Sequence, residues 1–86
     1  MLTREEVLAG TKKIIMDNVP EMVQGELTED TVLNNETAID SMGFILVVTK
    51  LEGKFNVHIP DEEWGKMQTV RDLVNTVMKH LPKDNA

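Results

Sequence analysis

Residues 41–55 read SMGFILVVTKLEGKF, and the fold depends on whether they form a helix or a strand. The aliphatic, largely β-branched run at 45–48 is also typical of a strand. Two features favour a helix: Ser41 is a good N-cap, and apolar residues recur at helical spacing after it. These residues are Phe44, Val47, Val48, Leu51 and Phe55. We therefore predict a helix over about 41–55.

Capping residues and apolar periodicity predict two further long helices. Thr3 and Glu6 form a capping box, and the helix that follows ends before Pro20. One face of this helix carries Val7, Leu8, Thr11, Ile14 and Ile15. Thr69 caps a last helix, which Pro82 ends. Its apolar stripe is Val70, Leu73, Val74, Val77, Met78 and Leu81.

The connections between these helices differ in length. The acidic residues 61–63 follow Pro60 and predict the first turn of a short helix that reaches Trp64 and Lys66. Residues 19–40 form a long connection, whose apolar residues we expect to pin it to the core. They are Val19, Met22, Val23, Leu27, Val32, Leu33 and Ile39. The predicted fold is all-α: a small antiparallel bundle of three main helices plus one short helix, with the long loop between the first and second helices.

Length and composition limit the class of protein. With 86 residues, the chain is expected to form one domain over 1–86, frayed at 1–2 and 82–86. Gly10 inside the first helix destabilises it by roughly 1 kcal/mol relative to alanine, which suggests close packing there. The chain has no cysteine, so a thiol in its function would have to come from a cofactor. No apolar run is long enough for a membrane span, and we expect a soluble, cytoplasmic monomer.

The distribution of charge is uneven. The formal net charge is −6, which argues against nucleic acid or an anionic membrane as the main partner. No Lys or Arg lies between Lys13 and Lys50. The same stretch holds Asp17, Glu21, Glu26, Glu29, Asp30, Glu36 and Asp40. These acids either solubilise the surface or attract partners with positive patches, and the two roles are compatible.

No catalytic set is visible in the sequence. His58 and His80 have no obvious acid or nucleophile partner, so surface or capping roles are expected. The acids at 61–63 lack the spacing and glycine of a calcium loop and suit a helix start instead. Trp64 is expected to anchor the edge of the core. We predict that the protein is not an enzyme.

Ser41 has two interpretations. It is a helix cap, or it presents a hydroxyl for covalent modification; a phosphate ester there would be favoured by the helix N-terminus. Met42, Ile45 and Leu46 lie close to it and off the predicted buried face. Exposed apolar residues beside a reactive serine indicate a docking surface, unless the long loop covers them.

The chain resembles the acyl carrier proteins over about residues 1–81. The resemblance rests on Asp40-Ser41-Met42-Gly43, on the segment 57–63 and on Thr69-Val70, which stand in register. It implies that Ser41 carries 4′-phosphopantetheine, attached from coenzyme A by a separate phosphopantetheinyl transferase. Asp40 would belong to the modification motif. The cofactor thiol would hold an acyl or aminoacyl group, supplied by a loading ligase and passed to a downstream transferase or synthase.

The helix after the serine departs from the fatty-acid type of carrier. Carriers of that type have exposed acids there, whereas this helix has Glu52 as its only acid beside two lysines, and apolar residues at 45 and 46. A specialised carrier is therefore favoured, and Asp-Ser-Met-Gly also resembles D-alanyl and peptidyl carriers. The expected docking residues are Met42, Ile45, Leu46 and Glu52. The alternatives are an unmodified helical adaptor and an enzyme with Ser41 as nucleophile, for which no base is apparent.

Overall fold

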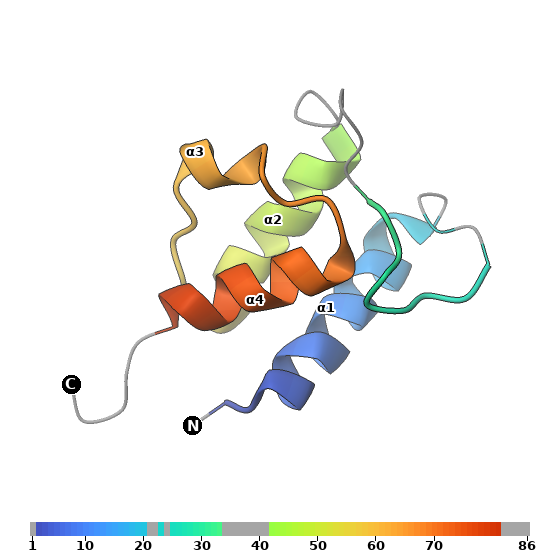
Figure 1. Ribbon diagram of the computed structural model, residues 1–86, viewed down its shortest axis with the longest axis horizontal. Coiled ribbons are helices and arrows are strands. Elements are labelled where there is room, and N and C mark those ends of the chain that lie inside the picture. Colours follow the sequence, from blue (N-terminus) through green and yellow to red (C-terminus); the bar gives the residue numbers. More distant parts are fainter. Residues whose placement is uncertain (1, 21–22, 24, 34–41, 82–86) are drawn as a thin grey trace.

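Three long helices enclose the apolar core, and a short fourth helix lies beside them (Figure 1). The computed structural model describes residues 2–20, 23, 25–33 and 42–81. The helices are α1 (Arg4–Asn18), α2 (Met42–Phe55), α3 (Asp61–Trp64) and α4 (Val70–His80). α1 and α2 run in opposite directions, and α4 lies across them (Figure 1). The predicted all-α fold of three main helices and one short one is confirmed.

The first and last long helices begin at the predicted caps. Thr3 Oγ1 accepts a hydrogen bond from Glu6 N at 3.1 Å, and Glu6 Oε1 accepts one from Thr3 N at 2.9 Å. Thr69 and Asp72 repeat this reciprocal box at the start of α4. Each box satisfies backbone N–H groups that have no partner within the helix. The predicted cap of α2, Ser41, lies outside the described residues.

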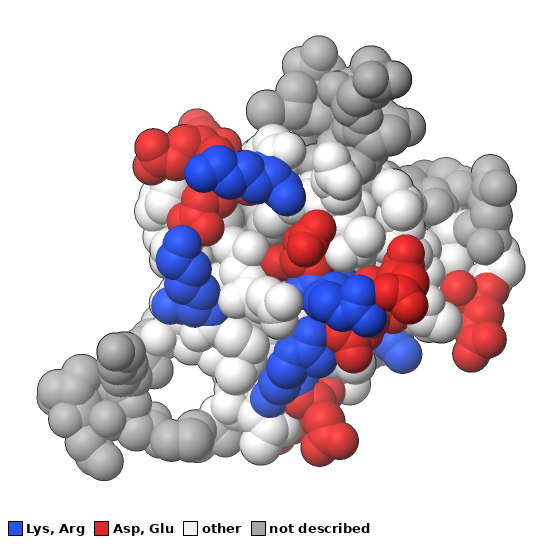
Figure 2. Space-filling view, viewed as in Figure 1, with Lys and Arg blue, Asp and Glu red and all other residues white. Residues whose placement is uncertain are grey.

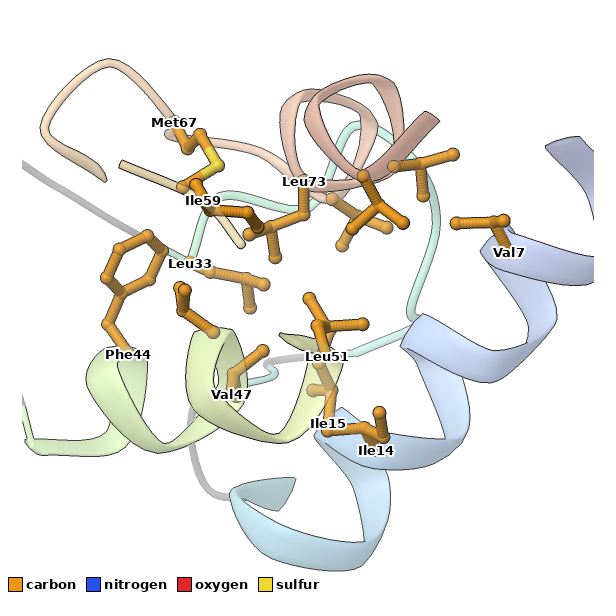
Figure 3. Packing of buried hydrophobic residues seen from close by; sticks show 14 of the residues in the cluster. Val7, Ile14, Ile15, Leu33, Phe44, Val47, Leu51, Ile59, Met67 and Leu73 are labelled. Atoms are coloured by element: carbon orange, nitrogen blue, oxygen red, sulfur yellow. The ribbon is translucent and has the colours of Figure 1, made fainter. Parts of the chain in front are cut away.

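Helix α2 is the central element of the core. It contacts both α1 and α4, and these two also contact each other. Figure 3 shows side chains of the three helices pointing into one core, which also includes Ile59 and Met67 from the connections on either side of α3. The residues of α2 that are buried are those predicted, Phe44, Val47, Val48, Leu51 and Phe55. The helical periodicity of this stretch thus prevails over its strand-like composition.

The short helix is anchored by its tryptophan. The indole Nε1 of Trp64 donates to the carbonyl of Ile59 at 3.0 Å, and the side chain packs against the core. The predicted core-edge role is confirmed. α3 begins directly after Pro60 but ends at Trp64, short of the predicted Lys66. The chain continues there as a turn, in which Lys66 N donates to Glu63 O at 3.1 Å.

The described part of the long connection is fixed to the start of α4. Leu33 N donates to Gln68 O at 2.8 Å, and Val70 N donates to Thr31 O at 3.1 Å, around an antiparallel bridge between Val32 and Thr69. The predicted anchoring to the core holds for the buried or half-buried Val19, Val23, Leu27 and Leu33.

Val32 departs from this prediction, since the residue is 59% exposed. Neighbouring side chains of an extended segment point to opposite sides, and the next residue, Leu33, is buried. Val32 therefore faces outward. Met22 and Ile39, named in the same prediction, lie outside the described residues.

Gly10 lies where α1 approaches the end of α2. A Cβ atom on Gly10 would lie 2.7 Å from Phe55 Cζ and 2.9 Å from Lys54 Cε. A methyl group does not fit at these distances without displacing the ring or the lysine stem. The close packing predicted for this glycine is confirmed.

Alanine substitutions at two glycines should therefore have opposite effects. Gly53→Ala in α2, where a Cβ meets nothing within 4 Å, should raise the free energy of unfolding by up to about 1 kcal/mol through helix propensity. Gly10→Ala should lower the free energy of unfolding by about 1 kcal/mol. The cost of overpacking against Phe55 and Lys54 is larger there than the gain in helix propensity. Urea unfolding followed by the fluorescence of Trp64 measures both. Equal stabilisation by the two substitutions would contradict the close packing.

Candidate functional site

The predicted modification site lies at the start of α2. Asp40 and Ser41 are outside the described residues, and α2 begins at the next residue, Met42. Met42 is 82% exposed, so the helix starts at the surface. No acidic residue occupies the first turn of α2. A phosphate attached at its start would therefore be attracted by the free helix N–H groups and would not be repelled by a carboxylate of that turn. Ser41 is also the only serine in the chain.

Three of the predicted docking residues lie on the first two turns of α2. Met42 and Leu46 are exposed one turn apart, and Leu46 is 37% exposed. Ile45, between them, is half-buried. The buried residues of the same turns, Phe44 and Val47, face the core. The exposed apolar surface next to position 41 is thus present, and its docking role stays a prediction.

The fourth predicted docking residue, Glu52, makes contacts within the chain. Its Oε2 accepts a hydrogen bond from Ile59 N at 2.8 Å and lies 3.5 Å from His58 Nδ1. The side chain is 22% exposed. Glu52 holds the chain that leaves α2 through Asn56, whose φ of 55° is a left-handed conformation that asparagine tolerates. Its role in docking stays a prediction, but its carboxylate already stabilises this turn.

The loop that leads toward Ser41 is anchored by an ion cluster. Glu29 Oε1 lies 2.6 Å from Arg4 Nη2 and 3.6 Å from Arg71 Nε, and Arg71 Nη1 lies 2.6 Å from Asp30 Oδ1. Arg4 also donates to Asn75 Oδ1. The hydrogen bond and positive charge of Arg4 lower the pKa of Glu29. These contacts join the loop to the starts of α1 and α4. The paired residues lie too far apart in the sequence for a local pattern to predict them.

Several acids of the predicted negative stretch are paired rather than free. Besides Glu29 and Asp30, Asp17 lies 3.1 Å from Lys13. On the face shown in Figure 2, acidic and basic side chains adjoin one another over α4. The expected attraction of positively charged partners is therefore reduced in this part of the loop. Glu21, Glu36 and Asp40 lie outside the described residues.

His80 has an acid partner that sequence reasoning missed. Its Nε2 lies 2.7 Å from Glu63 Oε2, and Lys79 Nζ lies 3.3 Å from Glu63 Oε1. The hydrogen bond from His80 lowers the pKa of Glu63. The partners stand on α3 and α4, 17 positions apart, so no local pattern joins them. The cluster ties the short helix to the last one.

The described residues offer neither a cluster of metal ligands nor a membrane-spanning helix. They contain no group of three or more His, Cys, Asp or Glu side chains able to hold a metal ion. None of the helices in the described part is both long and apolar enough to cross a membrane.

Comparison with known proteins decides the family. A sequence model described as "Phosphopantetheine attachment site" matches residues 15–77, well over half of the chain. The chain belongs to the phosphopantetheine-binding acyl carrier proteins. An acyl carrier protein of Lactobacillus acidophilus is 33% identical over 79 residues, which cover 92% of this chain and 98% of that one. A meromycolate extension acyl carrier protein of Mycobacterium leprae is 32% identical over 84 residues, covering 98% of this chain and 71% of that one.

Membership of this family sets the chemistry of the protein. Acyl carrier proteins are carriers without catalytic activity of their own, as predicted for this chain. The phosphopantetheine cofactor predicted from the sequence is that of the family. The described start of α2 fits such a group, because it is exposed and its first turn holds no acid.

The ion pair between Glu29 and Arg4 should make stability depend on pH. Because the folded protein lowers the pKa of Glu29 below its ordinary value of 4.5, its stabilisation is present above pH 4.5 and is lost as the pH falls through the lower, folded pKa. The Glu29→Gln variant should therefore be less stable than wild type above pH 4.5, and the difference should shrink below it. Urea unfolding at a series of pH values measures this difference.

Glu62→Gln, at an exposed position on α3, is the matched control and should leave the free energy of unfolding unchanged. If Glu29→Gln lowered that free energy equally at every pH, the account would be contradicted.

Proposed function

We propose that this acyl carrier protein bears its 4′-phosphopantetheine on Ser41. The observation that carries the proposal is that Ser41 is the only serine of the chain and directly precedes α2, within the matched stretch 15–77. The thiol of the bound cofactor holds acyl or aminoacyl groups as thioesters. Asp40 belongs to the motif that the modifying enzyme recognises.

The partners follow from this cycle of loading and transfer. A phosphopantetheinyl transferase attaches the arm, a ligase loads it, and a transferase or synthase removes the cargo; we place these events in the cytoplasm. Met42, Ile45, Leu46 and Glu52 are the proposed docking residues. Support comes from the exposure of Met42 and Leu46 beside the attachment position.

A specialised rather than housekeeping role is the favoured subtype. Helix α2 has Glu52 as its only acid, and that carboxylate is hydrogen-bonded to Ile59. The relatives that match include meromycolate extension acyl carrier proteins as well as general acyl carrier proteins.

The mass of the intact protein tests the attachment. After co-expression with a broad-specificity phosphopantetheinyl transferase, wild type should gain the mass of one phosphopantetheine group, and Ser41→Ala should gain none. Thr49→Ala, which removes an exposed hydroxyl in the middle of α2, is the matched control and should be modified like wild type.

Loss of modification must be separated from loss of the fold. Ser41→Ala should keep the helical circular dichroism of wild type and lose about 1 kcal/mol of stability through the missing cap. An unmodified wild-type protein, or a modified Ser41→Ala variant, would contradict the proposal. Global unfolding of Ser41→Ala would assign the serine a structural role, and the unmodified adaptor would then be preferred.

A further inference from the structure

The outward face of α2 changes character along the helix. The outward face of α2 consists of its exposed residues, Met42, Leu46, Thr49, Lys50, Gly53 and Lys54. The first two are large and apolar and lie nearest to position 41. The two lysines lie further along, starting about 12 Å from Met42 at 1.5 Å per residue. Gly53, between the lysines, has open space where a side chain would stand, so this end of the face is accessible to a partner.

The positive charges of this face are not balanced within α2. Neither Lys50 nor Lys54 takes part in the ion pairs formed among the described residues. Lys54 Nζ lies 5.8 Å from the ring centroid of Phe55, a cation–π contact with a neutral side chain that adds no negative charge to this face. The one acid of α2, Glu52, is 22% exposed and accepts the hydrogen bond from Ile59 N. The six residues of this face therefore carry two positive charges and no negative one, while the carboxylate of Glu52, the remaining acid among the proposed docking residues, is engaged with Ile59 N.

These charges stand out against the rest of the chain. The formal net charge is −6, yet the helix next to the attachment position presents cations outward. Several acids elsewhere, such as Glu29 and Glu63, are held by cations of the chain itself. Complementary charges around an apolar contact speed encounter and set the register of two proteins, whereas facing like charges oppose their association.

We propose that the enzyme which docks on this face presents an apolar patch bordered by acidic side chains. The apolar patch covers Met42 and Leu46, and the acids face Lys50 and Lys54. The proposal rests on the proposed function, since the face matters because it adjoins Ser41. A partner with a basic border is disfavoured, because its cations would meet both lysines.

Two synthetic helical peptides test the preference of this face. Both carry the same leucine face; one is flanked by glutamates and the other by lysines. Each is titrated into the ¹⁵N-labelled protein and followed by NMR. The glutamate peptide should shift the amide signals of the outward face of α2 and bind at least about tenfold more tightly than the lysine peptide. This advantage should shrink between about 0.01 M and 0.15 M salt, because the Debye length falls from about 30 Å to about 8 Å.

A charge exchange assigns the preference to this face. Lys50→Glu should reduce or reverse the difference between the peptides, whereas Lys66→Glu, the same change at an exposed position after α3, should preserve it. Lys54 is left unchanged because its stem packs near Gly10. Tighter binding of the lysine peptide, equal binding, or binding of neither would overturn the proposal. The titration needs no phosphopantetheine, so its failure is distinct from a failure of Ser41 to be modified.

Discussion

The burial of α2 between α1 and α4 is the constraint on which this structure depends. The run 45–48 is rich in residues that favour strands, so burial has to stabilise the helix. Each large apolar side chain that becomes fully buried contributes about 1.5–3 kcal/mol, and α2 buries five, Phe44, Val47, Val48, Leu51 and Phe55. Contact with two neighbouring helices leaves a single outward face, which begins beside the proposed attachment residue. One side of α2 therefore packs in the core, and its exposed side is the one that we propose meets the partner enzymes.

The second constraint fixes the loop that approaches this helix. Residues 31–33 pair with 68–70 by backbone hydrogen bonds, and Glu29 joins Arg4 and Arg71. Residues 31–33 are therefore held against the start of α4 before the chain continues toward Ser41. The two capping boxes fix the starts of α1 and α4, the two helices to which this anchor is attached.

The sequence predicts those parts of the structure that depend on local sequence patterns. The caps at Thr3 and Thr69, the helical spacing of 44–55 and the close packing at Gly10 all depend on residues a few positions apart or on a single residue type. The contacts that it did not predict join residues far apart: Glu29 with Arg4, His80 with Glu63, and Val32 with Thr69. The outward turn of Val32 belongs to the same class, because only the pairing with α4 decides which side of the segment is buried. At the site, exposure of Met42 and Leu46 followed from helical phase, whereas the hydrogen bond of Glu52 to Ile59 depends on how the chain turns after α2.

The central claim is that this fold serves to present one modified side chain, Ser41, at the start of α2. Fragmentation of the proteolytic peptide that spans this position, by tandem mass spectrometry of protein made with a phosphopantetheinyl transferase, tests it most directly. The account predicts that the phosphopantetheine mass lies on Ser41 and on no other residue. A modification located on one of the threonines, or a peptide recovered without any modification from a protein that is correctly folded, would contradict it.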